Sequence, residues 1–198
     1  MQSKDRYTNI TCPPSTQFVI SDGTYINASR IKFPSVEFVA TQWPLENTKQ
    51  DFWKMVKQYD PQVIIAFSLN NENTHPIYWE SAQIHNTRIP KTIKRLIKIS
   101  EKQQVVHYEC KWWPDHGIPD SDCLSLMISS LQTKGVSRVI VHCSAGVGRT
   151  GSFVALYGSL TSSVSIDEAV RVVRNARNEK CIEQSQLAFL KDFVNSKK

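Results

Sequence analysis

The chain has 198 residues, of which 40% are hydrophobic and 21% charged, a composition typical of one globular domain over 1–198 with an ample core. No apolar run approaches the ~20 residues of a membrane span, so stable membrane association is not expected. The formal charge of +6 is modest, and no basic stripe is interleaved with aromatic residues, so nucleic acid is not an expected partner.

The first third of the chain predicts strands and one helix. Short runs of apolar or β-branched residues predict strands at 18–20, 25–28, 38–42 and 63–67. The turn sequence at 21–23, Ser-Asp-Gly, joins the first two into a predicted β-hairpin. Asn47 is expected to cap a helix over 48–58, whose apolar residues repeat at helical spacing.

The rest of the chain alternates between the two kinds of element. Strands are predicted at 93–100, 105–112 and 139–141, and helices at 121–134, 149–160, 165–177 and 184–194. The run 93–100 also fits a basic amphipathic helix of the kind that binds membrane surfaces, but a strand is the favoured interpretation. Because strands and helices intermix, the expected fold class is α/β, with a central twisted, partly parallel mixed sheet flanked by helices.

The loop between the strand at 139–141 and the helix at 149–160 carries the clearest chemistry. Its small residues place backbone N–H groups and a helix N-terminus at one point, where they can bind a phosphate. Cys143 lies in the same field, which can bring a thiol pKa from about 8.5 to roughly 3.5–7.5. Arg149 can bind two phosphate oxygens with its planar fork. A thiolate beside an anion site predicts a phosphate-ester hydrolase that forms a phosphocysteine, with a buried structural cysteine as the simpler alternative.

A second candidate group lies at 112–117, Trp-Trp-Pro-Asp-His-Gly. Asp115 can protonate a leaving oxygen, and its carboxylate can then act as the base that activates water. Taken alone, the segment is equally well explained as a solvated turn.

The cysteines indicate the compartment. There are five, an odd number without a C-x-x-C pair, so neither a disulfide framework nor a zinc site is expected. We therefore expect a reducing, cytoplasmic location and no metal or other cofactor.

Residues 142–151, His-Cys-Ser-Ala-Gly-Val-Gly-Arg-Thr-Gly, match every fixed position of the signature His-Cys-x-x-Gly-x-x-Arg-[Ser/Thr]-Gly, so the chain resembles the protein tyrosine phosphatases. Residues 112–117 are similar to the mobile acid loop of that family. Residues 4–7, Lys-Asp-Arg-Tyr, are similar to the loop with which its tyrosine-specific members recognise phosphotyrosine. Further similar segments are interpreted as scaffold: 25–28, 41–42, 44–45, 47–48, 51–53 and 78–79.

The resemblance implies a role for each site residue. Cys143 is the expected nucleophile, Asp115 the general acid and base, and Arg149 the phosphate ligand. Thr150 is expected to donate a hydrogen bond to the Cys143 sulfur, and His142 to hold the loop and tune the thiolate. The expected substrate-binding residues are Tyr7, Asn9, Ser144, Ala145, Gly146, Val147, Gly148 and Gln186.

Three departures from the family pattern bear on turnover. Trp43 stands where the family has a glycine. Asn9 replaces an aspartate that holds the backbone of the substrate peptide, so peptide binding is expected to be weaker. Ile182 aligns with the first of two glutamines, which positions hydrolytic water, and Gln186 aligns with the second. Gln184 could take the role of the first if the loop shifts.

Two further departures concern the extent of the domain. The chain begins later than a full family domain, so it is expected to lack the usual N-terminal helices. The connection over 79–93 is short, where a longer loop normally carries a glutamate that orients the signature arginine. Glu72 and Glu80 are the candidates for that role.

The expected function is hydrolysis of phosphotyrosine in proteins by a cytoplasmic, monomeric signalling enzyme. One alternative is a phosphotyrosine-binding pseudophosphatase with little turnover, which Asn9, Trp43 and Ile182 favour. Another is an enzyme that acts on phosphoserine or phosphoinositides. Against it, Tyr7 would deepen the pocket beyond the reach of short side chains, and residues 145–148 lack the lysines expected for inositol phosphates.

Overall fold

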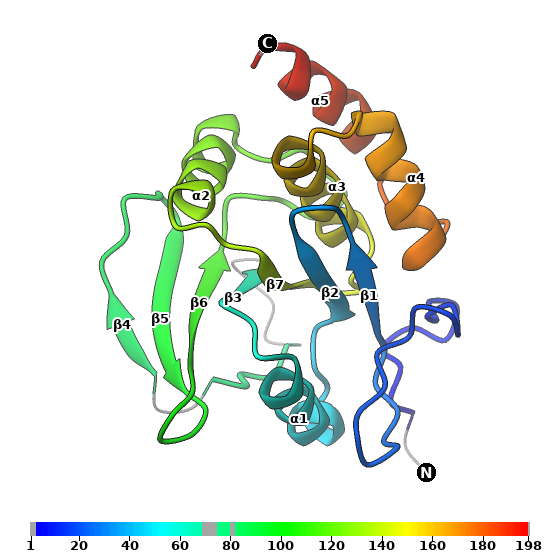
Figure 1. The fold of residues 1–198 in the computed structure, drawn as a ribbon, viewed down its shortest axis with the longest axis vertical. Coiled ribbons are helices and arrows are strands. Elements are labelled where there is room, and N and C mark those ends of the chain that lie inside the picture. The colour runs from blue at the N-terminus through cyan, green and yellow to red at the C-terminus, as the bar shows by residue number, and fades with distance from the viewer. Residues whose placement is uncertain (1–2, 69–74, 80–81, 198) are drawn as a thin grey trace.

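The computed structural model describes residues 3–68, 75–79 and 82–197. The strands in this part are β1 Ala28–Lys32, β2 Glu37–Gln42, β3 Val63–Phe67, β4 Gln83–His85, β5 Thr92–Lys98, β6 Gln104–Cys110 and β7 Arg138–Cys143. They form one sheet in the order β1-β2-β7-β3-β6-β5-β4 (Figure 1). Its four central strands are parallel, and β1, β5 and β4 pair antiparallel at the sides. The predicted partly parallel mixed sheet is confirmed.

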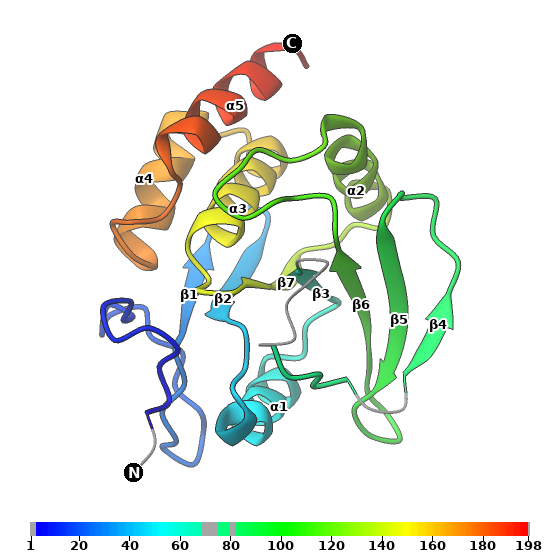
Figure 2. The same ribbon diagram turned by 180° about the vertical axis from the view of Figure 1, so that it is seen from behind.

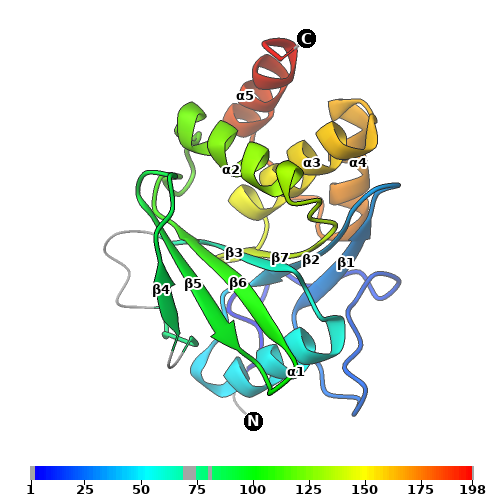
Figure 3. The ribbon, with the colours of Figure 1, turned by 60° about the vertical axis from the view of Figure 1, so that its left-hand side comes forward.

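Helices cover both faces of this sheet. They are the 3-10 turn η1 Glu46–Thr48, α1 Lys49–Tyr59, α2 Ser121–Thr133, α3 Gly148–Ser162, α4 Ile166–Ala176 and α5 Gln184–Asn195. Figures 2 and 3 show α1 on one face and α2 to α5 on the other. All five α-helices match helices expected from the sequence.

The core lies on both faces because the central strands are buried on both sides. In β7, Val139 and Val141 pack with the helices α2 to α5, whereas Ile140 packs with α1. All three side chains are fully buried. The contiguous apolar runs that predicted β3 and β7 therefore reflect strands with no solvent-facing side.

The run 93–100 forms a strand, so the alternative of an amphipathic helix is wrong. β5 pairs antiparallel with β6 along its whole length. Arg95 and Ile97 are buried, whereas their neighbours Lys94, Leu96 and Lys98 are more exposed. The side chains therefore alternate with the period of a strand.

The predicted hairpin over 18–28 is wrong in most of its pairing. The turn at Gly23 is present, with φ of 78° and a hydrogen bond from its N–H to the Ile20 carbonyl. The flanking segments pair antiparallel only at their outer ends, through a bridge between Gln17 and Ser29 and a hydrogen bond from the Phe18 N–H to the Ala28 carbonyl at 2.8 Å. The strand begins only at Ala28 and pairs with β2.

The predicted cap at Asn47 is also wrong. Asn47 lies inside η1, and its side-chain amide donates to the Ser3 carbonyl at 3.2 Å. Thr48 occupies the N-cap position of α1 without a side-chain capping bond.

Among the described residues, no helix is both long and apolar enough to cross a membrane.

Candidate active site

The signature loop lies where β7 ends and α3 begins, at the carboxyl edge of the parallel strands. Ligands bind at this edge in open α/β sheets. Gly146 turns the loop with φ of 73°, and a Cβ atom there would lie 2.2 Å from the Thr41 carbonyl oxygen. No other residue fits this position without moving the backbone of β2.

The loop carbonyls are bound to the scaffold. Arg177, fully buried after the end of α4, donates from Nε to the Gly146 carbonyl at 3.0 Å and from Nη2 to the Ala145 carbonyl at 3.2 Å. The N–H of Trp43 donates to the Ser144 carbonyl at 2.9 Å. Sequence reasoning missed Arg177, because no pattern distinguishes it from an ordinary arginine at a helix end.

Several buried donors of α3 have no hydrogen-bond partner among the described residues. Arg149 is buried, yet its Nε and Nη1 atoms make no hydrogen bond within the described part of the chain. The hydroxyl of the buried Thr150 is likewise unpaired there, so the expected hydrogen bond from Thr150 to the Cys143 sulfur is not made in this structure. Buried polar groups are rarely left unpaired unless a ligand takes them up. With the thiol of Cys143, also buried, at the base of the loop, this set suits an oxyanion.

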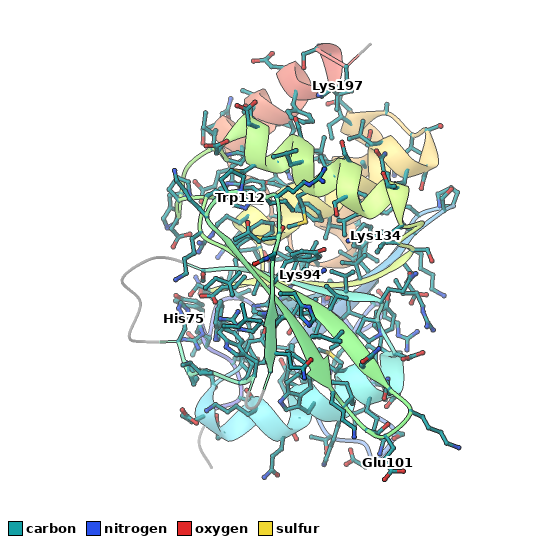
Figure 4. The ribbon with its side chains drawn as sticks, turned by 90° about the vertical axis from the view of Figure 1, so that its left-hand side faces the viewer. His75, Lys94, Glu101, Trp112, Lys134 and Lys197 are labelled. Atoms are coloured by element: carbon teal, nitrogen blue, oxygen red, sulfur yellow. The ribbon has the colours of Figure 1, made fainter. Side chains whose placement is uncertain are left out.

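The acid loop reaches the same point from the end of β6. The Oδ1 atom of Asp115 lies 3.0 Å from Nη2 of Arg149. The indole of Trp112 donates to the Thr92 hydroxyl at 2.9 Å, and that of the buried Trp113 donates to the Gly117 carbonyl at 3.0 Å. These bonds fix the loop on both sides of Asp115. Figure 4 shows Trp112 beside α2.

Tyr7 lies beside the signature loop. Its hydroxyl lies 3.1 Å from Oγ of Ser144, and Nε2 of His75 lies 3.0 Å from the same oxygen. The tyrosine side chain is 44% exposed, so its ring is accessible to a ligand. Burial lowers the pKa of His75 to about 4, with the charges of Arg6 and Arg149 adding to this effect. His75 was not predicted from the sequence as a residue of this site.

The segments interpreted as scaffold hold the recognition loop. Tyr25 and Asn27 both donate to Oδ1 of Asp5, at 2.7 and 2.8 Å. The Gln42 side chain accepts from the Arg6 N–H at 2.9 Å and donates to the Lys4 carbonyl at 2.8 Å. Lys4 also forms an ion pair with Asp51 of α1 at 2.8 Å. These bonds anchor residues 4–6 to the scaffold and so set the position of Tyr7, the next residue.

His142 is fully buried below the loop. Its Nε2 atom lies 2.6 Å from the Tyr78 hydroxyl, which also lies 2.8 Å from Nε2 of His107. Burial lowers the pKa of His142 to about 3, so the ring is neutral and a weak base. Trp43 packs against it with ring centroids 4.8 Å apart. The departure at Trp43 therefore adds a large ring beside the residue that precedes Cys143.

Gln186 is buried between three elements. Its Oε1 accepts from the Ser152 hydroxyl and from the Glu183 N–H, both at 3.1 Å, and its Nε2 donates to the Gly117 carbonyl at 3.3 Å. These bonds join α3, α5 and the acid loop. The predicted substrate-binding residue thus makes structural bonds with its whole amide group.

The other positions singled out in the sequence differ in their exposure. Ile182 is buried, and its backbone has φ of 68°, which is unusual for a β-branched residue. Gln184 and Asn9 are exposed. Val147 and Gly148 complete the loop at the start of α3. The proposed partners of Arg149 at 72 and 80 lie outside the described residues.

The metal-ligating side chains do not gather at the site. In the described ranges no group of three or more His, Cys, Asp or Glu side chains could hold a metal ion. All five cysteines are free thiols.

Comparison with known proteins identifies the family. The family model described as protein-tyrosine phosphatase matches residues 1–196. Human receptor-type tyrosine-protein phosphatase R is 37% identical over an alignment that covers 77% of this chain and 28% of the relative. The Drosophila virilis tyrosine-protein phosphatase corkscrew is 28% identical, with 90% and 28% covered. This chain thus spans less than a third of these relatives.

Solved structures agree on the fold. The Trypanosoma cruzi protein tyrosine phosphatase TcPTP1 superposes with a TM-score of 0.84 at 20% identity, covering 98% of this chain and 82% of the other. The family match over residues 1–196 includes the signature loop, the acid loop and the recognition loop. The chain therefore belongs to the protein-tyrosine phosphatase family.

Proposed function

We propose that this chain is an active protein-tyrosine phosphatase, which hydrolyses phosphotyrosine in proteins through a phosphocysteine on Cys143. The observation that carries the proposal is the buried guanidinium of Arg149, whose Nε and Nη1 are unpaired within the described residues and whose Nη2 forms an ion pair with Asp115. Buried donors without hydrogen-bond partners are costly unless an anion binds them. A phosphate monoester supplies that anion and the bond to be broken.

In the first step, the Cys143 sulfur attacks phosphorus while the bond to the tyrosine oxygen breaks. Asp115 donates its proton to that oxygen, so that tyrosine leaves as a neutral phenol. Arg149 and the loop amides bind the equatorial oxygens of the transition state. Phosphate bound to Arg149 also weakens the attraction of that cation for the Asp115 carboxylate.

In the second step, water attacks the phosphocysteine and the S–P bond breaks. The Asp115 carboxylate takes a proton from the water, which yields inorganic phosphate. The buried Thr150 hydroxyl can donate to the sulfur as it regains its negative charge. Neutral His142, held by Tyr78, is a positioning residue in this mechanism, because its lowered pKa makes the ring too weak a base to accept a proton in the reaction.

Ile182 supports a second candidate, a phosphotyrosine-binding protein with little turnover. Its side chain is apolar and buried, so it offers attacking water no hydrogen bond. Gln186 has its amide group engaged with Ser152, Glu183 and Gly117. Slow hydrolysis of the phosphocysteine would then keep the enzyme phosphorylated.

The test is turnover of a phosphotyrosine peptide, measured beside Cys143→Ser. Sustained phosphate release that Cys143→Ser abolishes supports the enzyme. A release rate equal to that of Cys143→Ser, with peptide binding retained, supports the binding protein. Equal rates on phosphothreonine or phosphoinositide would contradict tyrosine specificity. We further propose a monomer in the cytoplasm that acts on phosphotyrosine proteins in signalling and needs no cofactor.

A further inference from the structure

The tip of the acid loop is bonded to the first turn of α5. Nδ1 of His116 lies 2.7 Å from Oε1 of Glu183, the N-cap residue of that helix. One residue further, the Gly117 carbonyl accepts from Gln186 of the same turn at 3.3 Å. Two successive residues of the acid loop therefore contact one helix end, directly after Asp115.

The backbone of the loop is folded to make this contact. His116 has φ of 53°, in the left-handed region that non-glycine residues seldom occupy. A Cβ atom on Gly117 would lie 2.8 Å from Cγ of Pro114, so the turn is tight. Such a conformation persists only where neighbouring contacts hold it. The His116 side chain is 79% exposed, so packing holds it little. The bond to Glu183 is therefore the contact that can hold this conformation.

The charges around His116 favour its protonated form in this position. Glu183 on α5 lies at hydrogen-bond distance, and Oδ2 of Asp115 lies 4.0 Å from Nε2 of His116 on the same loop. Arg149 on α3 opposes them. The hydrogen bond to Glu183, followed by the Asp115 charge, raises the pKa of His116.

We propose that His116 and Glu183 are a pair of positioning residues that latch the acid loop onto α5 and so hold Asp115 over the signature loop. The inference rests on the proposed function, in which Asp115 is the general acid. Neither residue touches the phosphate. Their effect is to raise the fraction of molecules in which the carboxyl group can reach the leaving oxygen.

The latch predicts a loss confined to proton donation. His116→Gln and Glu183→Gln should each lower kcat on a phosphotyrosine peptide by about two- to fivefold, the range for an exposed ion pair. An aryl phosphate whose leaving group needs no proton should show no such loss. Glu168→Gln removes an exposed carboxylate of α4 paired with Arg171 and serves as the matched control, with no change on either substrate.

Coupling and pH separate a latch from a general loss of fold. The double variant should lose no more than either single variant, because the two side chains act through one contact. The ratio of wild-type to His116→Gln kcat should be largest at low pH and should fall toward one as pH rises through the raised pKa of His116. Additive losses in the double variant, or equal losses on the phosphotyrosine peptide and on the aryl phosphate that needs no proton, would overturn the latch.

A second measurement is independent of catalysis. In a Cys143→Ser background, Glu183→Gln should increase hydrogen exchange of amides 115–118 and leave amides of the sheet unchanged. Unchanged exchange in the loop would overturn the latch even if the enzyme is active. Increased exchange with no turnover in the parent protein would instead contradict the proposed function and leave the latch standing.

Discussion

Asp115 and Arg149 form an ion pair across the site, with Oδ1 of the carboxylate 3.0 Å from Nη2 of the guanidinium. The side chain of Arg149 is 1% exposed and that of Asp115 is 40% exposed. The carboxylate therefore competes with a phosphate group for the same buried cation. A ligand that binds Nη2 of Arg149 has to displace this contact, whereas Nε and Nη1 have no partner among the described residues.

Replacing Asp115 with alanine should thus separate binding from turnover. Asp115→Ala removes the proton donor, and we expect kcat on a phosphotyrosine peptide to fall by roughly 10²–10⁴. It also frees Arg149, so the Kd of the same peptide should stay equal or decrease. Calorimetric titration in a Cys143→Ser background gives the Kd. Asp122→Asn, an exposed carboxylate on α2, is the control. Parallel loss of binding and kcat would mean that Asp115 is structural.

Arg177 should stabilise both the fold and the conformation of the signature loop, because it binds two of the loop carbonyls. Arg177→Met removes the charged hydrogen bonds to the Ala145 and Gly146 carbonyls and a third bond to Sγ of Cys12. At about 1.5–3 kcal/mol for each of the two carbonyl bonds, unfolding free energy should fall by roughly 3–6 kcal/mol. Vanadate binding should weaken with it.

The matched control for Arg177 is Arg171→Met on α4, whose side chain is 66% exposed and paired with Glu168. Urea denaturation and vanadate titration of both variants make the comparison. If Arg177→Met binds vanadate as tightly as Arg171→Met, the scaffold of the loop does not depend on the buried arginine.

Elements and motifs with a local signal could be predicted from the sequence. The apolar run at 63–67 matches β3, because a central parallel strand is buried on both faces and needs no alternation. The signature loop could be placed between β7 and α3, since a β-branched run precedes it and helical spacing follows. These features depend on neighbouring residues only.

Features that depend on distant residues could not be predicted. β4 has three exposed residues and no apolar pattern, and it exists through its pairing with β5. The segment at 18–20 satisfied the strand pattern, but its antiparallel pairing is limited to a bridge between Gln17 and Ser29 and a bond from Phe18 to Ala28. Arg177 and the contact between His116 and Glu183 join segments far apart in the chain. Tertiary packing decides each of these cases.

The buried histidines should make stability fall in acid. Burial lowers the pKa of His142 to about 3 and that of His75 to about 4, so the unfolded chain binds more protons than the folded chain between pH 4 and 6.5. Unfolding free energy should therefore rise with pH in this window, by up to about 1.4 kcal/mol per pH unit for each histidine.

Urea denaturation between pH 4 and 6.5 measures this slope. His142→Asn should reduce it, because the variant has no group to protonate on unfolding. His85→Gln, on the exposed edge strand β4, should leave the slope unchanged. A slope in the His142→Asn variant equal to that of the wild-type protein would contradict a neutral, buried His142.

Ile182 should limit the second chemical step. Its buried apolar side chain gives water no hydrogen bond at the position where the family has a glutamine, so the phosphocysteine should accumulate. Rapid mixing with a phosphotyrosine peptide should show a burst of tyrosine release followed by a slower steady rate. Ile182→Gln should raise the steady rate by roughly tenfold or more without changing the burst, since a positioned water reacts faster. Ile182→Leu, which stays apolar at the same left-handed backbone position, is the control for packing and strain. An increase shared by both variants would trace the slow step to the backbone at 182 and not to the missing hydrogen bond.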